Sequence, residues 1–362
     1  MENTNSIVSA GALTLLRDCV GGSAGERLLI VSEPEGNNFY DDDAPSLTAI
    51  AARSLGMTVY ETEAKSFIAT SADTKALVKT LSGFDHVVFF SRLGDQIRFS
   101  ENVDIPPATM CYTLNRESLN SAFGTACYHG LCEIKRIIDE AFLTARSIQV
   151  TCPRGTDYRG APENSTQPPT EVTLKRFPML VPQPVPCMGF SGKIALSRFL
   201  IGTGSRFYEP YFQPLPNDVT AYIEDNGITE FDGPADDVTL VENHYRHVAS
   251  QFNIDPWYVH SWHAGMHPGC HFSQAAESDI IRWSGSAFGN PRLLHFHTCG
   301  NYAPGEISWN ILDPTIIIDD IAVWENGCLH PERLPDSARV LDRHPNLVEL
   351  YRTPVRDIGL AS

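Results

Sequence analysis

The chain has 362 residues, 42% of them hydrophobic and 20% charged, which is ordinary for a globular protein but longer than a usual single domain. We therefore expect two domains. The 44 acidic residues outnumber the 27 basic ones and give a formal net charge of −17, so nucleic acid and membranes are not expected partners, because such a surface repels phosphate backbones and anionic lipid.

Strands and helices alternate over the first 150 residues. The run 27–32 is largely apolar, as expected of a strand buried on both faces. The expected strands are 27–32, 57–60, 86–90 and 108–112, and the expected helices are 43–53, 74–81 and 132–145. This rhythm predicts an α/β domain over 1–150 with a mostly parallel sheet flanked by helices.

The composition changes after residue 150. The segment 151–190 is rich in proline, glycine and threonine, and we interpret it as an interdomain crossing. Beyond it strands dominate, since Asn226-Gly227 between alternating runs is a strong hairpin signal and 315–324 predicts a second hairpin. A helix is expected over 238–252. The segment 191–362 is therefore predicted to be a strand-rich α+β domain.

The cysteines do not form a recognisable framework. There are nine, with no C-x-x-C pair, whereas a disulfide scaffold or a zinc ribbon needs paired spacing. The first five residues lack the basic start of a secretory signal. Both features predict reduced thiols in a cytoplasmic protein. Cys299, beside His297, is a candidate nucleophile, with a small buried apolar residue as the alternative.

Histidines crowd one part of the chain, and eight of the twelve lie between His244 and His297. Neutral imidazoles with a carboxylate are ligands that divalent transition metals prefer. His295 and His297 alternate by two, so on a strand they share a face, and on the next strand Ile311 and Asp313 would do the same. Two histidines and Asp313 could form a facial triad of the non-haem iron type, with packed, hydrogen-bonded histidines as the alternative.

Two other histidine pairs have a structural interpretation beside the functional one. His263 and His267 have the spacing of one helix face, but the intervening glycine and the following proline favour hydrogen-bonded loop histidines. His244 and His247 have a spacing that binds metal in helical bundles, while a solvated helix face is the alternative.

Several motifs, taken in order, resemble a metalloenzyme family. They are an opening strand, a Gly-Thr-Asp signature, a Gly-x-x-Pro turn and a terminal segment that ends in a hairpin. They stand at 25–30, 148–157, 265–268 and 295–324. This order is similar to that of the family that includes the thermophilic aminopeptidase T enzymes and the iron-dependent 2,5-dihydroxypyridine 5,6-dioxygenase. The resemblance covers most of the chain.

The resemblance implies a metal site that this chain matches only in part. The family's first ligand position falls on Ser261, with His260 one residue away. The family's final His-x-Asp pair falls on Ile311 and Asp313, so the aspartate is kept and the histidine is replaced by a residue without a lone pair.

Histidines nevertheless flank another matched position. The peptidase histidine of the family falls on Phe296, between His295 and His297, and Tyr302 lies one residue from the family's tyrosine. The resemblance therefore implies one retained ligand, several lost ones and substitutes close by.

The interpretation ranked first is a catalytically degenerate member that binds a peptide in the former active-site cleft. Such members resemble the accessory proteins of crocagin-type ribosomal peptide biosynthesis, which present a precursor peptide to a modifying oxygenase. This interpretation expects no catalytic residue and no cofactor, and the resemblance implies a homodimer. The predicted cleft residues are His260, Trp262, His263, His267, His295, His297, Tyr302, Trp309 and Asp313.

The alternative is a working metalloenzyme. Its predicted ligands for Fe2+ or Zn2+ are His260, His295, His297 and Asp313, with open positions for substrate and water or dioxygen. A hydrolase would also need a general base, and no glutamate stands at a position matched to the family; Glu306, expected in a loop between two strands, is the only nearby candidate. We therefore rank an oxygenase of small aromatics above an aminopeptidase.

Overall fold

The computed structural model describes residues 8–34, 39–64, 71–98, 105–162, 174–202 and 206–360. The chain divides into two compact units. Unit 1 contains Met1–Leu131 and Thr170–Met179, and unit 2 contains Cys132–Pro169 and Leu180–Ser362. The boundary expected at residue 150 lies inside unit 2, because the strand at 148–151 pairs only with strands of that unit in the described part of the chain.

Unit 1 is built on a parallel sheet with the strand order β2-β1-β3-β4-β7. The strands are β1 (Arg27–Ser32), β2 (Thr58–Glu63), β3 (His86–Phe90), β4 (Ala108–Cys111) and β7 (Leu174–Phe177). The central strands β1, β3 and β4 are buried almost throughout, as apolar strands of a covered parallel sheet should be. The predicted parallel α/β architecture is confirmed.

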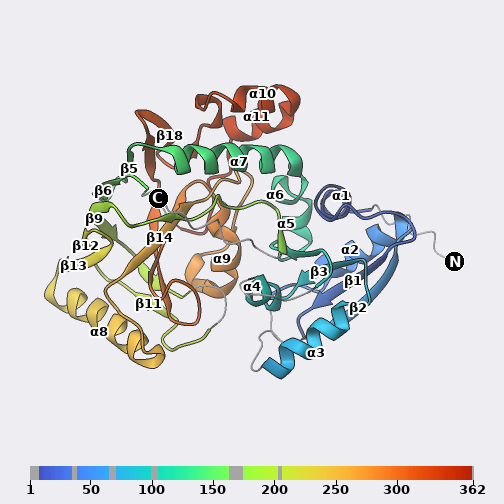
Figure 1. The fold of residues 1–362 in the computed structure, drawn as a ribbon, viewed down its shortest axis with the longest axis horizontal. Coiled ribbons are helices and arrows are strands. Elements are labelled where there is room, and N and C mark those ends of the chain that lie inside the picture. The colour runs from blue at the N-terminus through green and yellow to red at the C-terminus, as the bar shows by residue number, and fades with distance from the viewer. Residues whose placement is uncertain are drawn as a thin grey trace. The chain divides into compact units, whose positions relative to one another are not determined.

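Helices connect these strands, and in Figure 1 the sheet lies between α1 and α3. Residues three and four positions apart bury one side of α2. Asn115 starts α5 by accepting a hydrogen bond from the Ser118 amide. The helical segments are α1 (Ala10–Thr14), the π-helix η1 (Leu15–Val20), α2 (Asp43–Ser54), α3 (Ser71–Leu81), α4 (Leu93–Arg98), α5 (Arg116–Asn120) and α6 (Ala122–Thr125).

Unit 2 contains an antiparallel sheet with the order β13-β12-β9-β6-β5-β17-β18-β19. Both predicted hairpins are confirmed. Asp225 and Asn226 have φ of 44° and 63°, and Asp319 and Asp320 have φ of 45° and 71°, the left-handed pairs that tight hairpin turns require. The strands are β5 (Ile148–Thr151), β6 (Asp157–Gly160), β9 (Phe190–Leu196), β12 (Val219–Glu224), β13 (Gly227–Asp232), β17 (Thr315–Ile318), β18 (Ile321–Glu325) and β19 (Cys328–Leu329).

A second antiparallel sheet of unit 2 has the order β11-β10-β16-β15-β14-β8. Aromatic side chains join the two sheets, since the Phe296 ring lies 5.5 Å from Tyr158 and the Trp262 ring lies 6.3 Å from Phe190. This aromatic core fixes one face of the second sheet. Its strands are β8 (Val185–Pro186), β10 (Phe199–Ile201), β11 (Phe212–Pro214), β14 (Val259–Ala264), β15 (Leu293–Cys299) and β16 (Glu306–Leu312).

Helices of unit 2 flank these sheets. Helix α7 (Tyr128–Thr144) contains the boundary between the units, and α8 (Ala235–Phe252) extends the helix predicted over 238–252. None of the described helices is long and apolar enough to cross a membrane. The remaining helical segments are η2 (Ala276–Ser278), α9 (Ile280–Ser286), η3 (Ala287–Gly289), η4 (Pro331–Arg333), α10 (Ser337–Arg343) and α11 (Pro345–Arg352).

Candidate metal centre

Three histidines of unit 2 converge on one point. His263 belongs to β14, and His295 and His297 belong to β15. The Nε2 atom of His263 lies 2.6 Å from Nε2 of His295 and 3.3 Å from Nε2 of His297. One ring nitrogen from each residue lies within 4.8 Å of the other two, and all three side chains are buried. In the described part of the chain, this is the group of three that could hold a metal ion.

Strand pairing brings these rings together. In the antiparallel register of β14 and β15, His263 lies opposite His295, and Ser261 lies opposite His297. Because side chains alternate along a strand, His295 and His297 project from the same face, which confirms the predicted shared face. Phe296, between them, projects into the aromatic core on the other side. The sheet therefore has one apolar face and one face that carries the histidines.

Hydrogen bonds fix the protonation of two of the rings. Nδ1 of His263 lies 3.2 Å from the carbonyl oxygen of Pro182, and Nδ1 of His297 lies 2.6 Å from Oε1 of Glu306. Carbonyl and carboxylate oxygens accept hydrogen bonds, so each Nδ1 carries a proton. In a neutral ring the lone pair is then on Nε2, so the Nε2 lone pairs of His263 and His297 lie 3.3 Å apart, and that of His263 can accept a hydrogen bond from Nε2 of His295 at 2.6 Å.

This donor set fits a transition metal ion. Two imidazole nitrogens bound to one tetrahedral ion at about 2.1 Å stand about 3.4 Å apart, close to the 3.3 Å between His263 and His297. The 2.6 Å between His263 and His295 is a hydrogen-bond length, so these two rings would have to move apart by several tenths of an ångström to share an ion. A cation between the lone pairs would also relieve their repulsion. Three protein ligands with an open position are usual at catalytic metal sites. His263, His295 and His297 are therefore the residues that would hold the ion.

Apolar neighbours keep His295 in the form that binds metals. Its ring stacks on Phe288 of η3, with centroids 4.4 Å apart, and Phe288 also contacts Trp283 in a buried cluster. Burial, and next the nearby His297, lower the pKa of His295 well below its usual range. The ring thus stays neutral, as a metal ligand must.

Glu306 and Pro182 orient the other two rings. A carboxylate or carbonyl behind a histidine fixes its tautomer and raises its basicity toward a metal. Glu306 is the first residue of β16 and lies opposite Cys299 at the end of β15, so it is part of the sheet and not of the expected loop. Through its hydrogen bond to Nδ1 of His297, Glu306 orients that imidazole ring.

The structure does not bring His260 or Asp313 to the three-histidine cluster. Nε2 of His260 lies 2.8 Å from the carbonyl oxygen of Cys299, and burial lowers the pKa of His260. Asp313 follows the end of β16 with a φ of 50°, and its oxygens each lie 2.7 Å from the guanidinium of Arg292. A third contact comes from Arg356 at 3.1 Å.

The aromatic residues predicted to line the cleft do not surround the three histidines. Trp262 and Trp309 are fully buried and pack around Phe296 on the apolar face, away from the histidines. Tyr302 is exposed. Ile311, at the matched histidine position, pairs with Leu294 and so projects from the face opposite to His295.

The other histidine pairs do not form ligand sets. His267 is a buried loop residue whose Nδ1 accepts a hydrogen bond from the Gly269 amide, in agreement with the hydrogen-bonded alternative. His247 lies on the exposed side of α8, and its Nε2 is 2.8 Å from the carbonyl oxygen of Glu209. His244 is buried on the same helix beside Tyr208.

The sequence placed His263 in the predicted cleft but not among the metal ligands, and it gave Glu306 as a candidate base and not as the hydrogen-bond partner of His297. The sequence contained a signal for the position of His263, because an apolar residue, Trp262, is followed by a polar one, as on a strand with one buried face. The pairing of β14 with β15, which places His263 opposite His295, joins segments 32 residues apart and could not be read from local pattern.

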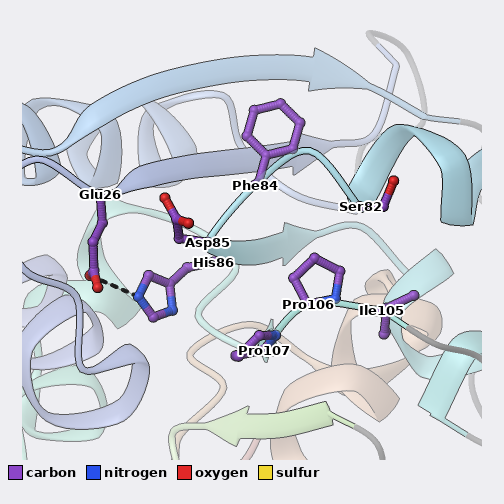
Figure 2. Close-up of a pocket in the computed structure, with 8 residues that line it drawn as sticks. All are labelled: Glu26, Ser82, Phe84, Asp85, His86, Ile105, Pro106 and Pro107. Atoms are coloured by element: carbon purple, nitrogen blue, oxygen red, sulfur yellow. Dashed lines mark hydrogen bonds and ion pairs between the residues drawn. The ribbon is translucent and has the colours of Figure 1, made fainter.

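A separate pocket of about 450 Å³ lies in unit 1 (Figure 2). Glu26 accepts a hydrogen bond from His86 at 2.9 Å at one end, and Phe84 and two prolines form apolar walls. These residues precede or begin β1, β3 and β4, whereas open parallel sheets bind ligands at the carboxyl ends of their strands. The pocket is therefore at the edge that such folds do not usually use.

Comparison with known proteins shows a likeness in fold. No protein-family model and no curated protein matches the sequence. Among solved structures, the chain is similar to 2,5-dihydroxypyridine dioxygenase from Pseudomonas putida, with a TM-score of 0.60 and 13% identity over 93% of this chain and 100% of that chain. The predicted resemblance to that dioxygenase is thus confirmed at the level of the fold.

Proposed function

We propose that this protein is a metal-dependent oxygenase that acts on a small aromatic substrate. The observation that supports this most is the convergence of His263, His295 and His297, which places one ring nitrogen of each within 4.8 Å of the other two. Three neutral ligands on one side of an ion leave positions for substrate and dioxygen, as in non-haem iron sites. The fold likeness to a dioxygenase is consistent with this proposal.

The chain's own residues have separate tasks in this proposal. The three histidines hold the ion, Glu306 and Pro182 keep two of the rings oriented, and Phe288 excludes water from the third. A bound ferrous ion would supply the electrons that activate dioxygen. If both oxygen atoms enter the product, oxidation of the substrate balances the reduction of O2, so no separate reductant is required.

A hydrolase is less well supported by the same geometry. Metal-assisted hydrolysis needs a carboxylate or another base near the bound water. Glu306 is the carboxylate at the cluster, but its Oε1 is engaged with Nδ1 of His297, behind the ring and not at the converging Nε2 atoms. We therefore keep an aminopeptidase below an oxygenase.

A specific observation favours a second function, a catalytically degenerate peptide-binding protein. The family's final ligand pair falls on Ile311, which faces away from the histidines, and on Asp313, which is held by Arg292. A protein of this kind would present a precursor peptide to a modifying oxygenase, as crocagin-type accessory proteins do, and would be a homodimer by the same resemblance. A net charge of −17 would favour a neutral or basic peptide.

Oxygen consumption separates the two functions. The protein is loaded anaerobically with Fe2+ and mixed with a panel of mono- and dihydroxylated benzenes and pyridines in an oxygen electrode. We expect one O2 consumed per substrate, uptake abolished in His295→Ala, and unchanged uptake in the control His247→Ala, which alters an exposed helix histidine. Uptake that survives His295→Ala would overturn the proposal.

The same preparation tests the second function. If the loaded protein consumes no oxygen with any member of the panel, it is titrated with a mixed tripeptide library, and bound peptides are identified by mass spectrometry. Retention of defined peptides by a protein without oxygenase activity would favour the peptide-binding function.

A further inference from the structure

Two polar residues of β16 lie beside the histidine centre. In the register of β15 and β16, Asn310 is opposite His295, and Ser308 is opposite His297. Directly opposed residues project from the same face, with Cβ atoms about 4.5–5.5 Å apart. Asn310 and Ser308 therefore extend the histidine face across a third strand.

Both side chains are buried without a protein partner. Asn310 is 8% exposed and Ser308 is fully buried. Neither the amide oxygen nor the amide nitrogen of Asn310 makes a hydrogen bond to any residue that the structure describes, and the same holds for Oγ of Ser308. Buried amides and hydroxyls are normally paired, because leaving them unpaired is costly.

Neighbouring positions of this sheet show that packing does not require polar side chains at positions 308 and 310. The neighbouring positions on the other face, Trp309 and Ile311, are apolar and closely packed. Ile201 of β10 lies opposite Ser308 and is also apolar and fully buried. A leucine or an alanine in place of the polar pair would avoid the unpaired atoms, so the pair points to a ligand.

We propose that Asn310 and Ser308 form a substrate-binding wall of the histidine centre that selects a neutral carboxamide over a carboxylate. This inference rests on the proposed metal-dependent function. A carboxamide edge offers one acceptor and one donor, which match the Nδ2 donor and Oδ1 acceptor of Asn310 in a pair of parallel hydrogen bonds. The Ser308 hydroxyl can complete the set.

The charges around the wall also favour a carboxamide over a carboxylate. Neither residue of the wall carries a charge, so the wall itself offers a carboxylate no ionic partner in exchange for its lost hydration. The Glu306 carboxylate is on the same face of β16, two residues from Ser308, and would repel a second anion. The proposed substrate therefore binds the metal through a hydroxyl group on an aromatic ring and reaches the wall through an adjacent carboxamide.

Two probes of nearly equal shape test the inference. The protein is loaded with Co2+, whose visible spectrum reports ligand exchange, and is titrated with 2-hydroxybenzamide, with 2-hydroxybenzoate and with azide. Azide needs only an open metal position. We expect 2-hydroxybenzamide to bind at least tenfold more tightly than 2-hydroxybenzoate.

Substitutions of Asn310 and Ser308 test whether these two residues cause the selectivity for a carboxamide. In Asn310→Leu we expect unchanged Co2+ content and azide affinity but at least tenfold weaker binding of 2-hydroxybenzamide, with a smaller loss in Ser308→Ala. The control Asn243→Leu changes an exposed asparagine of α8 and should alter nothing. The melting temperature of metal-free Asn310→Leu should equal or exceed that of the parent, because a buried unpaired amide is removed.

The outcomes separate the inference from the proposed function. Equal binding of 2-hydroxybenzamide to the parent and Asn310→Leu, or tighter binding of 2-hydroxybenzoate, would overturn the wall while leaving the metal centre intact. Loss of Co2+ in Asn310→Leu would make Asn310 an orienting partner of His295 and overturn the inference too. A parent protein that binds neither Co2+ nor azide would overturn both proposals.

Discussion

Replacing Asp313 with alanine distinguishes the ligand set expected from the sequence from the one in the structure. The sequence pattern places Asp313 among the metal ligands, whereas the structure pairs both of its oxygens with Arg292 at 2.7 Å and one of them with Arg356 at 3.1 Å. We therefore predict that Asp313→Ala lowers the stability of unit 2 and leaves metal binding intact.

The size of the loss follows from the burial of the pair. The Arg292 side chain is 4% exposed and that of Asp313 is 18% exposed. Removing one partner of a buried ion pair costs about 3–5 kcal/mol, because the other charge is left without compensation. Arg292 keeps a hydrogen bond to the carbonyl oxygen of Arg356, so we take the lower end, about 3 kcal/mol.

Thermal unfolding and elemental analysis of the same samples measure both effects. At about 2–4 °C per kcal/mol, Asp313→Ala should lower the melting temperature by about 6–12 °C. The control Asp336→Ala, at an exposed position before α10, should change it little. An unchanged melting temperature combined with lost metal would make Asp313 a ligand and refute this reasoning.

Three further predictions concern Glu306, His244 and Trp309. Glu306→Gln should weaken metal binding about 10- to 100-fold, because His297 loses its carboxylate partner, and a chelator competition titration that shows equal affinity would contradict this. Burial lowers the pKa of His244 to about 4, so below its unfolded pKa of about 6.5 the unfolded chain takes up a proton that the folded ring does not. His244 should therefore contribute about 2 kcal/mol to the loss of stability between pH 7 and pH 5, and His244→Phe should reduce the loss by that amount in denaturant titrations at the two pH values. Trp309→Ala should cost about 3–5 kcal/mol through lost core packing around Phe296, and a stable variant with altered ligand binding would instead place Trp309 in the site.

Local pattern was enough to predict much of the fold. The apolar run of β1 and the Asn226-Gly227 turn specify their conformations within a few residues, so both could be placed from sequence. The same alternation predicted the shared face of His295 and His297.

The rest of the site depends on contacts between distant segments. His263 becomes a candidate ligand only because β14 pairs with β15, and no local pattern specifies that register. Asp313 was expected to continue the alternation of β16, but its left-handed backbone ends the strand, and its carboxylate pairs with Arg292. The partner of a charged side chain depends on the tertiary structure, and the spacing of residues along the sequence does not reveal it.

Metal content tests the three-histidine centre most directly. The parent, His263→Ala and His260→Ala proteins are loaded with Fe2+ or Zn2+ anaerobically, desalted and analysed for metal per chain. The two variants remove histidines of the same strand, one at the cluster and one bound to the Cys299 carbonyl oxygen. We predict about one ion per chain in the parent and in His260→Ala, and none in His263→Ala. Metal lost from His260→Ala but retained by His263→Ala, or absent from the parent, would contradict the account.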